Sequence, residues 1–417
     1  YPTAKELLDY AELDLRPFYA GAAVRFDDRW SAVADPFRHP ADALATLLPS
    51  HPIGSPLDKL RVGLLRAGLL LKTPRDADAP SLLLRGGEET TTLEALRNFG
   101  FSEEMVDRFF RPFLGGIFFD NELKTSSRLF EFVMRSLATG ANCLPAEGGI
   151  GSVTRQMASK LPSGCIRLNS RVVGVEPSSV GSSAACAVLA DGTRVRGRLG
   201  VVVATERDAA EELLGAASPL LTVAPSKQGK GVGTCCAYFD APVAPLGGAP
   251  MLMLNGELLA GWKGATVNNA TCLSSVAPSY APAGRHLISV STVGTAEDFD
   301  EAALVEAMRE QLDGWCGRKS LPEGSSSSRS ASSSSASASA SPLDPNNAVD
   351  VSDWRHLRTY RIPFAQPPQS PPTDFERAVS LGRGLFVAGD HRGAATLEGA
   401  LAVGVRAADE AARRGGR

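Results

Sequence analysis

The stretch GLFVAGDHRGAATLEGALAVGVRAADEAA runs from Gly384 to Ala412. Its apolar start predicts a strand over Leu385–Asp390, and the polar, glycine-bearing loop that follows leads into a helix predicted over Leu397–Ala412. One face of that helix carries only small residues: Ala400, Gly404, Ala407 and Ala411. A face of this kind indicates either very close packing on another backbone or a helix that ends against a ligand.

The start of this helix has features of a ligand site. Thr396 is placed to cap the helix, whose dipole puts roughly half a positive charge at that end. Gly399 allows close backbone approach to a flat ligand, and Asp390, at the carboxyl end of a strand, suits a ribose or ribitol hydroxyl. A close-packed helix preceded by an ordinary Asp turn explains the same pattern, so both interpretations stay open at this point.

Composition sets the broad class. The 417 residues are enough for two or more domains, and 43% apolar with 21% charged residues is ordinary for a globular protein. A net charge of -3 argues against a general nucleic-acid binder. No run of eighteen apolar residues predicts a membrane span, although a shallow membrane-docking surface stays open. The seven Cys and five His form no disulfide framework and no metal-ligand spacing, which indicates a reducing compartment and no metal site.

The first third of the chain is predicted to contain mainly apolar helices. A short helix at 4–10 and strands around 17–26 come first, and residues 55–140 are predicted to be mainly helical. Thr92 and Ser102 are expected to cap two of these helices, and a further helix is expected over 126–140. Within 57–71 one helical stripe is formed by Leu57, Leu60, Leu64, Gly68 and Leu71.

From residue 165 the hydrophobic period changes to two. We expect a strand pair over 165–176, a hairpin turning at Asp191-Gly192 and a buried strand over 200–205. Further strands are predicted at 231–239, 250–254, 257–262 and 286–293. A helix after Asp298, with Glu301 at capping-box spacing, has an apolar stripe formed by Leu304, Val305, Met308, Leu312 and Trp315.

One segment has low sequence complexity. Residues 325–341 are almost entirely Ser and Ala, so they are expected to form a disordered insertion.

The glycine-rich run Gly148-Gly149-x-Gly151 precedes a helix and resembles a phosphate-binding loop. A phosphate loop of the dinucleotide type needs a strand directly before it, and residues 142–147 make a poor strand. A turn with a helix cap is therefore the favoured interpretation.

Three segments together resemble one family. Gly389-Asp390, followed by Thr396-Leu397-Glu398-Gly399-Ala400 and a small-residue helix, is similar to the closing flavin motif of the FAD-dependent amine oxidase and phytoene desaturase-like flavoprotein superfamily. Residues 144–161 are similar to that family's Pro-x-Gly-Gly loop and helix. Residues 166–176, followed by 201–205, are similar to its adenine-edge strand and the strand that closes its FAD sheet.

The resemblance implies an α/β fold in two parts. One is a partial FAD-binding Rossmann-like domain of the glutathione-reductase type, and the other is a substrate domain with a mixed β-sheet and apolar helices. The implied division is substrate and helical domain 1–140, FAD segment 141–220, substrate sheet and helix 221–324, insertion 325–341, substrate return 342–380 and FAD segment 381–417. The implied FAD-binding residues are Val172, Ala204, Thr205, Gly389, Asp390, Thr396, Leu397, Glu398, Gly399, Ala400 and Leu401.

The family opens with a strand, turn and helix that carry GxGxxG and hold the cofactor pyrophosphate. The sequence begins at Tyr1-Pro2 without that motif and without an initiator Met. We therefore expect the opening unit to have been cut away or lost from the gene model.

The resemblance implies hydride transfer to a flavin, with the helix start at Leu397–Leu401 stabilising the reduced ring, and it identifies no catalytic residue. Oxygen-using amine oxidases carry a Lys where this chain has Thr234, and an aromatic cage residue where it has Thr396. These departures favour an apolar, isoprenoid-like small-molecule substrate over an amine. Lys263 is a further candidate near the flavin, and a surface position is the more ordinary one for a lysine.

Two alternatives stay open: an FAD-dependent amine oxidase, and a non-catalytic flavoprotein-like scaffold.

The Ser/Ala insertion and the Ala/Arg-rich composition are similar to those of green-lineage proteins. A plastid location is therefore favoured, with the protein soluble or peripherally attached to a membrane.

Overall fold

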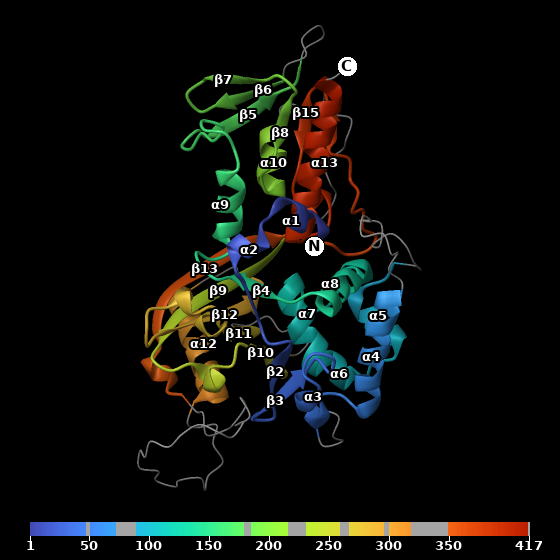
Figure 1. Ribbon diagram of the computed structural model, residues 1–417, viewed down its shortest axis with the longest axis vertical. Helices are drawn as coiled ribbons and strands as arrows, with labels where there is room; N and C mark the ends of the chain where they lie inside the picture. The colour runs from blue at the N-terminus through green and yellow to red at the C-terminus, as the bar shows by residue number, and fades with distance from the viewer. Residues whose placement is uncertain are drawn as a thin grey trace.

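The computed structural model describes residues 1–46, 51–71, 89–178, 185–215, 231–258, 267–295, 300–317 and 349–415. The predicted insertion at 325–341, Lys263 and Asp298 lie outside these residues. The chain forms two parts along its long axis, and β13 (Arg355–Gln366) and β9 (Val232–Ala241), which belong to the larger part, reach the junction between them (Figure 1).

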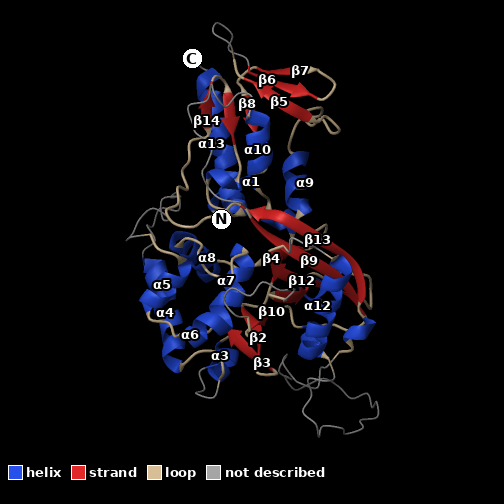
Figure 2. Cartoon of the chain, turned by 180° about the vertical axis from the view of Figure 1, so that it is seen from behind, coloured by secondary structure: helices blue, strands red, loops and turns tan. Residues whose placement is uncertain are grey.

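The smaller part is built on a three-stranded sheet of order β14-β15-β8, made of Ser380–Gly382, Leu385–Val387 and Val201–Val203. β15 and β8 run parallel, with Leu385 opposite Val201. α10 (Arg207–Leu214) and α13 (Leu397–Gly415) lie beside this sheet in both views (Figures 1 and 2). β15 is buried along its whole length, whereas β8 and β14 are only partly buried, and Val202 of β8 is exposed.

The second sheet of this part is antiparallel and has the order β5-β6-β7, made of Val172–Glu176, Ala185–Leu189 and Arg194–Gly197. The predicted hairpin is confirmed: Gly192 has a positive φ of 83° and its N–H donates to the Leu189 carbonyl at 3.0 Å. Val175 and Ala185 of this sheet pack in one apolar cluster with residues of β8 and β15.

The larger part is built on a seven-stranded mixed sheet of order β13-β9-β12-β11-β10-β2-β3. Besides β13 and β9 it contains His286–Val293 (β12), Asn269–Cys272 (β11), Leu252–Asn255 (β10), Gly21–Phe26 (β2) and Arg29–Ala34 (β3). β2 alternates between two cores, since Ala23 packs with the α12 cluster while Ala22 and Val24 pack with the helical cluster.

One face of the large sheet is covered by α12 (Glu301–Cys316), and the predicted stripe from Leu304 to Trp315 is buried there, as expected. The cap is different from the expected one. Asp300 is the N-cap, and its carboxylate accepts the N–H groups of Ala302 at 2.9 Å and Ala303 at 3.1 Å.

The other face is covered by helices α3 to α8. Their bounds are Pro40–Thr46, Pro56–Leu71, Thr92–Phe99, Glu103–Met105, Arg111–Phe118 and Ser127–Thr139, with a π-helical turn at Val106–Phe110. Ser102 caps α6 as predicted. The prediction of Thr92 as a cap was wrong: Thr91 is the N-cap of α5 and forms a reciprocal capping box with Glu94.

The apolar stripe of α4 does not face the core. Leu57, Leu60 and Leu64 are 52%, 60% and 56% exposed, and Leu71 is 85% exposed, whereas Leu65 and Leu69 are buried. The helix is apolar on more than one face, so periodicity alone did not identify the buried face.

Short elements join the two parts: α1 (Pro2–Leu7), α2 (Tyr10–Leu13), β1 (Leu15–Pro17), β4 (Cys143–Pro145) and α9 (Gly151–Ser159). A further short helix, α11 (Leu273–Val276), lies in the larger part and packs on β12. Of the expected strand pair at 165–176 only β5 forms, and in 257–262 the described residues 257–258 are not strand. β3, β4, β11 and β14 were not predicted, and residues 142–147, expected to make a poor strand, contain β4. The mixed sheets with covering helices confirm the α/β class.

Candidate functional site

The carboxyl ends of β8 and β15 lie side by side because the two strands are parallel neighbours. Ala204-Thr205 and Gly389-Asp390, all four implied by the resemblance to bind FAD, therefore meet at one edge of the sheet. Gly389 has φ 150°, and a Cβ atom there would lie 2.7 Å from the His391 ring and 3.5 Å from the Thr205 carbonyl oxygen. Only glycine fits this close approach comfortably.

Asp390 lies in a partly desolvated position at this edge. Burial raises the pKa of its carboxyl group above the ordinary value, and the nearby charge of Glu206 raises it further, against two backbone hydrogen bonds. Its side chain keeps 32% of its exposure, so a ligand hydroxyl has access to the carboxylate. The geometry suits the predicted hydroxyl-binding role.

His391 and Arg392 follow in a short 3₁₀ turn and are 6% and 8% exposed. Burial, followed by the charges of Arg392, Arg377 and Arg207, lowers the pKa of His391 to about 4. His391 Nδ1 and Arg392 Nε have no hydrogen-bond partner within the part of the chain that the structure describes. Two unpartnered buried donors or acceptors next to Asp390 fit a polar ligand at this edge.

The start of α13 has the predicted cap. Thr396 Oγ1 accepts the Gly399 N–H at 2.9 Å, and the Thr396 carbonyl accepts the Ala400 N–H at 2.9 Å. The first amides of a helix, here those of Leu397 and Glu398, have no intrahelical partner and are available to a ligand. Leu397 is 44% exposed at this end.

Gly399 is required by the protein's own backbone. A Cβ atom at this position would lie closer than 3.0 Å to the carbonyl oxygen and carbon of Ala394, a separation that real Cβ atoms essentially never show. The small-residue face is also used for packing, since Val403 and Ala407 are buried against Val379 and Ala388. The flavin contact of Gly399 stays a prediction, because close packing alone already accounts for the glycine.

The side chain of Glu398, one of the predicted site residues, forms hydrogen bonds with the backbone of α1. Its carboxylate, in a residue 7% exposed, accepts the N–H groups of Thr3 at 2.8 Å and Ala4 at 3.1 Å. Leu401 packs on the apolar cluster that contains Ala4. Val172 opens β5 and belongs to a separate sheet from the other predicted residues.

A largely apolar cavity of about 190 Å³ lies in the larger part, between β2, β3 and the helices α4, α7 and α8. Its residues with large apolar side chains include Leu69, Met105, Phe109, Phe110, Phe113 and Met134. Three charged residues also line it: Asp35, Arg38 and Arg66. The sequence predicted that 55–140 is helical and apolar, but no sequence pattern joins Asp35 to Arg66, and the sequence did not predict this charged group.

Thr234 stands in β9 where the resemblance places a lysine in oxygen-using relatives. It is 5% exposed, and its hydroxyl donates to the Thr292 carbonyl at 2.6 Å. The hydroxyl is therefore committed to the sheet. This position offers neither a cation nor a free proton donor.

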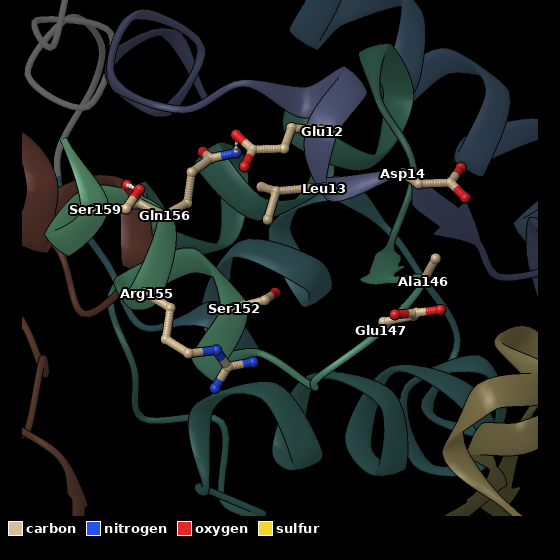
Figure 3. A pocket seen from close by; sticks show the side chains of 9 residues that line it. All are labelled: Glu12, Leu13, Asp14, Ala146, Glu147, Ser152, Arg155, Gln156 and Ser159. Atoms are coloured by element: carbon tan, nitrogen blue, oxygen red, sulfur yellow. Dashed lines mark hydrogen bonds between the residues drawn. The ribbon is translucent and has the colours of Figure 1, made fainter.

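A second, polar pocket of about 420 Å³ lies between α2 and α9 (Figure 3). Glu12, Asp14 and Glu147 line it with a single cation, Arg155. Gln156 donates to Glu12 at 2.7 Å, the contact drawn in Figure 3. This lining repels an anion.

The glycine-rich loop borders that acidic pocket. Gly148 and Gly149 have φ of 73° and 66°. Arg155 donates to the Gly148 carbonyl at 2.7 Å, and the Ser152 hydroxyl donates to the Gly149 carbonyl at 2.8 Å. These contacts support a turn leading into α9 rather than a phosphate cradle.

Two absences hold for the described residues. No helix there has the length and apolarity needed to cross a membrane. No group of three or more His, Cys, Asp or Glu side chains there is arranged to hold a metal ion.

Solved structures with a similar fold include an oxidoreductase, a mutase and putrescine oxidase. An oxidoreductase from Methanosarcina mazei is 14% identical with a TM-score of 0.62, over 95% of this chain and 81% of that one. A putrescine oxidase variant is 13% identical with a TM-score of 0.58, over 99% and 86%. A reduced UDP-galactopyranose mutase is 14% identical with a TM-score of 0.52, over 99% and 79%. A search of curated protein sequences finds no match.

The family match assigns the chain to the FAD-dependent oxidoreductases. The family model described as flavin containing amine oxidoreductase matches residues 5–412, and the chain belongs to that family. FAD is the cofactor of this class, and the residues present fit it: Asp390 offers a half-buried acceptor, His391 and Arg392 offer unpartnered polar atoms, and α13 offers its first amides.

Proposed function

We propose that this protein removes hydride from an apolar, isoprenoid-like small molecule, in the manner of a desaturase or dehydrogenase. The observation that carries the proposal is the cavity of about 190 Å³ walled by phenylalanine and methionine side chains. A mostly apolar pocket with few polar groups is the usual form of a site for an apolar ligand.

FAD accepts the hydride when bound, and the protein supplies orientation and electrostatics. Asp390 and the first amides of α13 are the groups of this chain that would hold it. The partial positive charge of the α13 start favours an electron-rich ring at that place. The phenylalanine wall would hold the substrate and exclude water from it.

An amine substrate is the main alternative, since the family takes its name from amine oxidation and one similar structure is a putrescine oxidase with putrescine bound. Two features weigh against it. Thr396 supplies no aromatic wall at the place that resemblance assigns to the amine cage. Arg38 and Arg66 line the cavity with only Asp35 to offset them, which disfavours a cation there.

The test is anaerobic reduction of the FAD-loaded protein. A panel would contain an acyclic isoprenoid, a saturated hydrocarbon of similar length and putrescine. Bleaching of the flavin absorbance by the isoprenoid alone is the expected result. Bleaching by putrescine would overturn the proposal in favour of an amine oxidase. A flavin that no member of a broad panel reduces would favour a non-catalytic scaffold, the third alternative.

We also propose peripheral contact with a membrane through α4, in a plastid as the favoured compartment. The stripe of Leu57, Leu60, Leu64 and Leu71 is exposed, and the opposite side of α4 lines the apolar cavity through Val62 and Leu69. An apolar substrate dissolved in a bilayer would then have a short route into the cavity.

Flotation with phosphatidylcholine vesicles tests this contact. The double substitution Leu60→Gln and Leu64→Gln should lower the bound fraction several-fold, because apolar area is lost from the stripe. The exposed pair Leu168→Gln and Val173→Gln, in the smaller part, is the matched control. Equal binding by both double variants would exclude α4 as the contact.

A further inference from the structure

We propose that the substrate of this cavity carries an anionic end group, a carboxylate or a phosphate, on its apolar chain, and that Arg38 and Arg66 bind that group. The inference rests on the proposed function for the identity of the cavity as a substrate site. It adds a chemical requirement that apolarity alone does not give.

The charge of the cavity lining is the first argument. Arg38, Arg66 and Asp35 are its charged residues, so two cations and one carboxylate leave one positive charge in a wall whose other residues are mostly apolar. A single charge beside a low-dielectric cavity interacts strongly with a ligand charge of opposite sign. An anion is stabilised there, and an ammonium group is repelled.

The two guanidinium groups share one acceptor. Arg66 donates to Asp35 at 2.7 Å, whereas Arg38 approaches the same carboxylate oxygen only to 3.8 Å. Arg66 also stacks on the ring of Phe37, with its guanidinium carbon 4.3 Å from the ring centre. Because Phe37 is 65% exposed, this end of the cavity is next to solvent. A head group bound there would stay close to water.

A structural role accounts for part of the arrangement. Arg66 donates to the Ala138 carbonyl at 2.9 Å and Arg38 to the Leu137 carbonyl at 3.0 Å, and Arg38 also donates to Gly140, so both arginines cap the end of α8. The helix end carries about half a negative charge and offsets only part of the surplus. A guanidinium has five N–H donors, and these contacts use a minority of them.

Cavity size selects the probes. At roughly 30 Å³ per water-sized group, about 190 Å³ holds a segment of about six such groups. Octanoate, octan-1-ol and octylamine therefore place alkyl chains of nearly equal length in the cavity and differ mainly in the head group. Binding to the FAD-loaded protein is measured by isothermal titration, with flavin reduction neither required nor used.

The expected order of affinity is octanoate first, octan-1-ol second and octylamine last. Arg66→Gln should weaken octanoate about tenfold or more, the usual scale for a hydrogen bond to a charged group, and leave octan-1-ol unchanged. Arg66→Lys, which keeps the charge, should restore part of the loss. Arg97→Gln removes an exposed arginine outside the cavity and should change neither ligand.

A second variant locates the binding. Gly63 lines the cavity, and a Cβ atom there would meet no atom within 4 Å, so Gly63→Leu can fill the space without a backbone clash. This variant should abolish binding of octanoate and octan-1-ol together. Circular dichroism on each variant confirms that the fold is kept.

Each outcome decides the proposal. Equal affinity for octanoate and octan-1-ol, or equal loss of both in Arg66→Gln, would overturn it and leave the arginines as caps of α8. Octanoate binding that survives Gly63→Leu would place the anion elsewhere and also overturn it. Failure of the proposed oxidation is separate, because it would appear as a flavin that no apolar substrate reduces while octanoate still binds here.

Discussion

The carboxylate of Glu398 accepts the backbone N–H of Thr3 at 2.8 Å, across 395 positions of the chain. The same carboxylate accepts the Ala4 N–H at 3.1 Å. An acidic residue of α13 thus serves as the acceptor for the first turn of α1, where a negative charge is also favoured by the helix dipole. The two helices are held together at the junction between the two parts of the molecule (Figure 1).

Removing this carboxylate should destabilise the protein. Glu398→Ala leaves two N–H groups without an acceptor, and the expected loss is about 3 kcal/mol in the free energy of unfolding. The matched control is Glu410→Ala on the same helix, whose pair with Arg413 at 2.8 Å lies at the surface and should contribute less than about 1 kcal/mol. Urea unfolding measures both. Equal small losses would show that the Glu398 contacts contribute little.

Two glycines of α13 should respond in opposite directions to alanine. Gly399→Ala forces a Cβ atom against the Ala394 carbonyl and should cost about 1–3 kcal/mol. At Gly404 a Cβ atom meets nothing within 4 Å, so Gly404→Ala should stabilise the helix by about 0.5–1 kcal/mol. Thermal unfolding separates the two. Destabilisation by Gly404→Ala would mean that something close-fitting covers that position.

His391 should make stability depend on pH. Its pKa of about 4 in the folded protein is below the ordinary 6.5, so the unfolded chain binds more protons between these values. Its contribution to stability is complete above pH 6.5 and is lost as the pH falls through that range, by about 2 kcal/mol between pH 7 and pH 5. Asp390, with a raised pKa, acts in the opposite direction at the acidic end.

The variant His391→Gln isolates this effect. The free energies of unfolding of wild type and variant are measured by urea titration at pH 7 and pH 5. The wild-type value minus the variant value should be lower at pH 5 than at pH 7. A difference that is the same at both pH values would mean that His391 titrates normally.

Asp390 should matter more for flavin retention than for folding. Asp390→Ala removes an acceptor at the edge formed by β8 and β15, and we expect a loss of about tenfold in FAD affinity with a nearly unchanged fold. Asp409→Ala, exposed on α13, is the charge-matched control. The flavin absorbance of the purified variants, set against their circular dichroism, measures both effects. Full flavin content in Asp390→Ala would remove the carboxylate from the cofactor site.

Local chemistry made much of the fold predictable. The run Leu385–Val387, the hairpin at Asp191-Gly192 and the stripe from Leu304 to Trp315 follow from hydrophobic period and turn residues within a few positions of each other. The shift from Thr92 to Thr91 as the cap of α5 is a boundary error of one residue, since three threonines in a row offer equivalent hydroxyls.

The candidate site was predictable only in part. Thr205 and Asp390 each follow an apolar strand, and their meeting follows once those strands are parallel neighbours. The hydrogen bonds of Glu398 with the first turn of α1 were not predictable, because its partners lie at the other end of the chain. The exposed stripe of α4 was ambiguous for another reason: a helix that is apolar on several faces does not reveal which one is buried.

The sequence by itself determined the α/β class, the flavin-type closing motif and most of the local elements, because period, caps and turns act over a few residues. Only the tertiary structure decided which residues share a cavity, since Asp35 and Arg66 meet through the packing of β3 against α4 and α8. It also decided why residue 399 is glycine, because the carbonyl of Ala394 occupies the space that any side chain would need. Such contacts depend on how whole elements pack, and no local pattern encodes them.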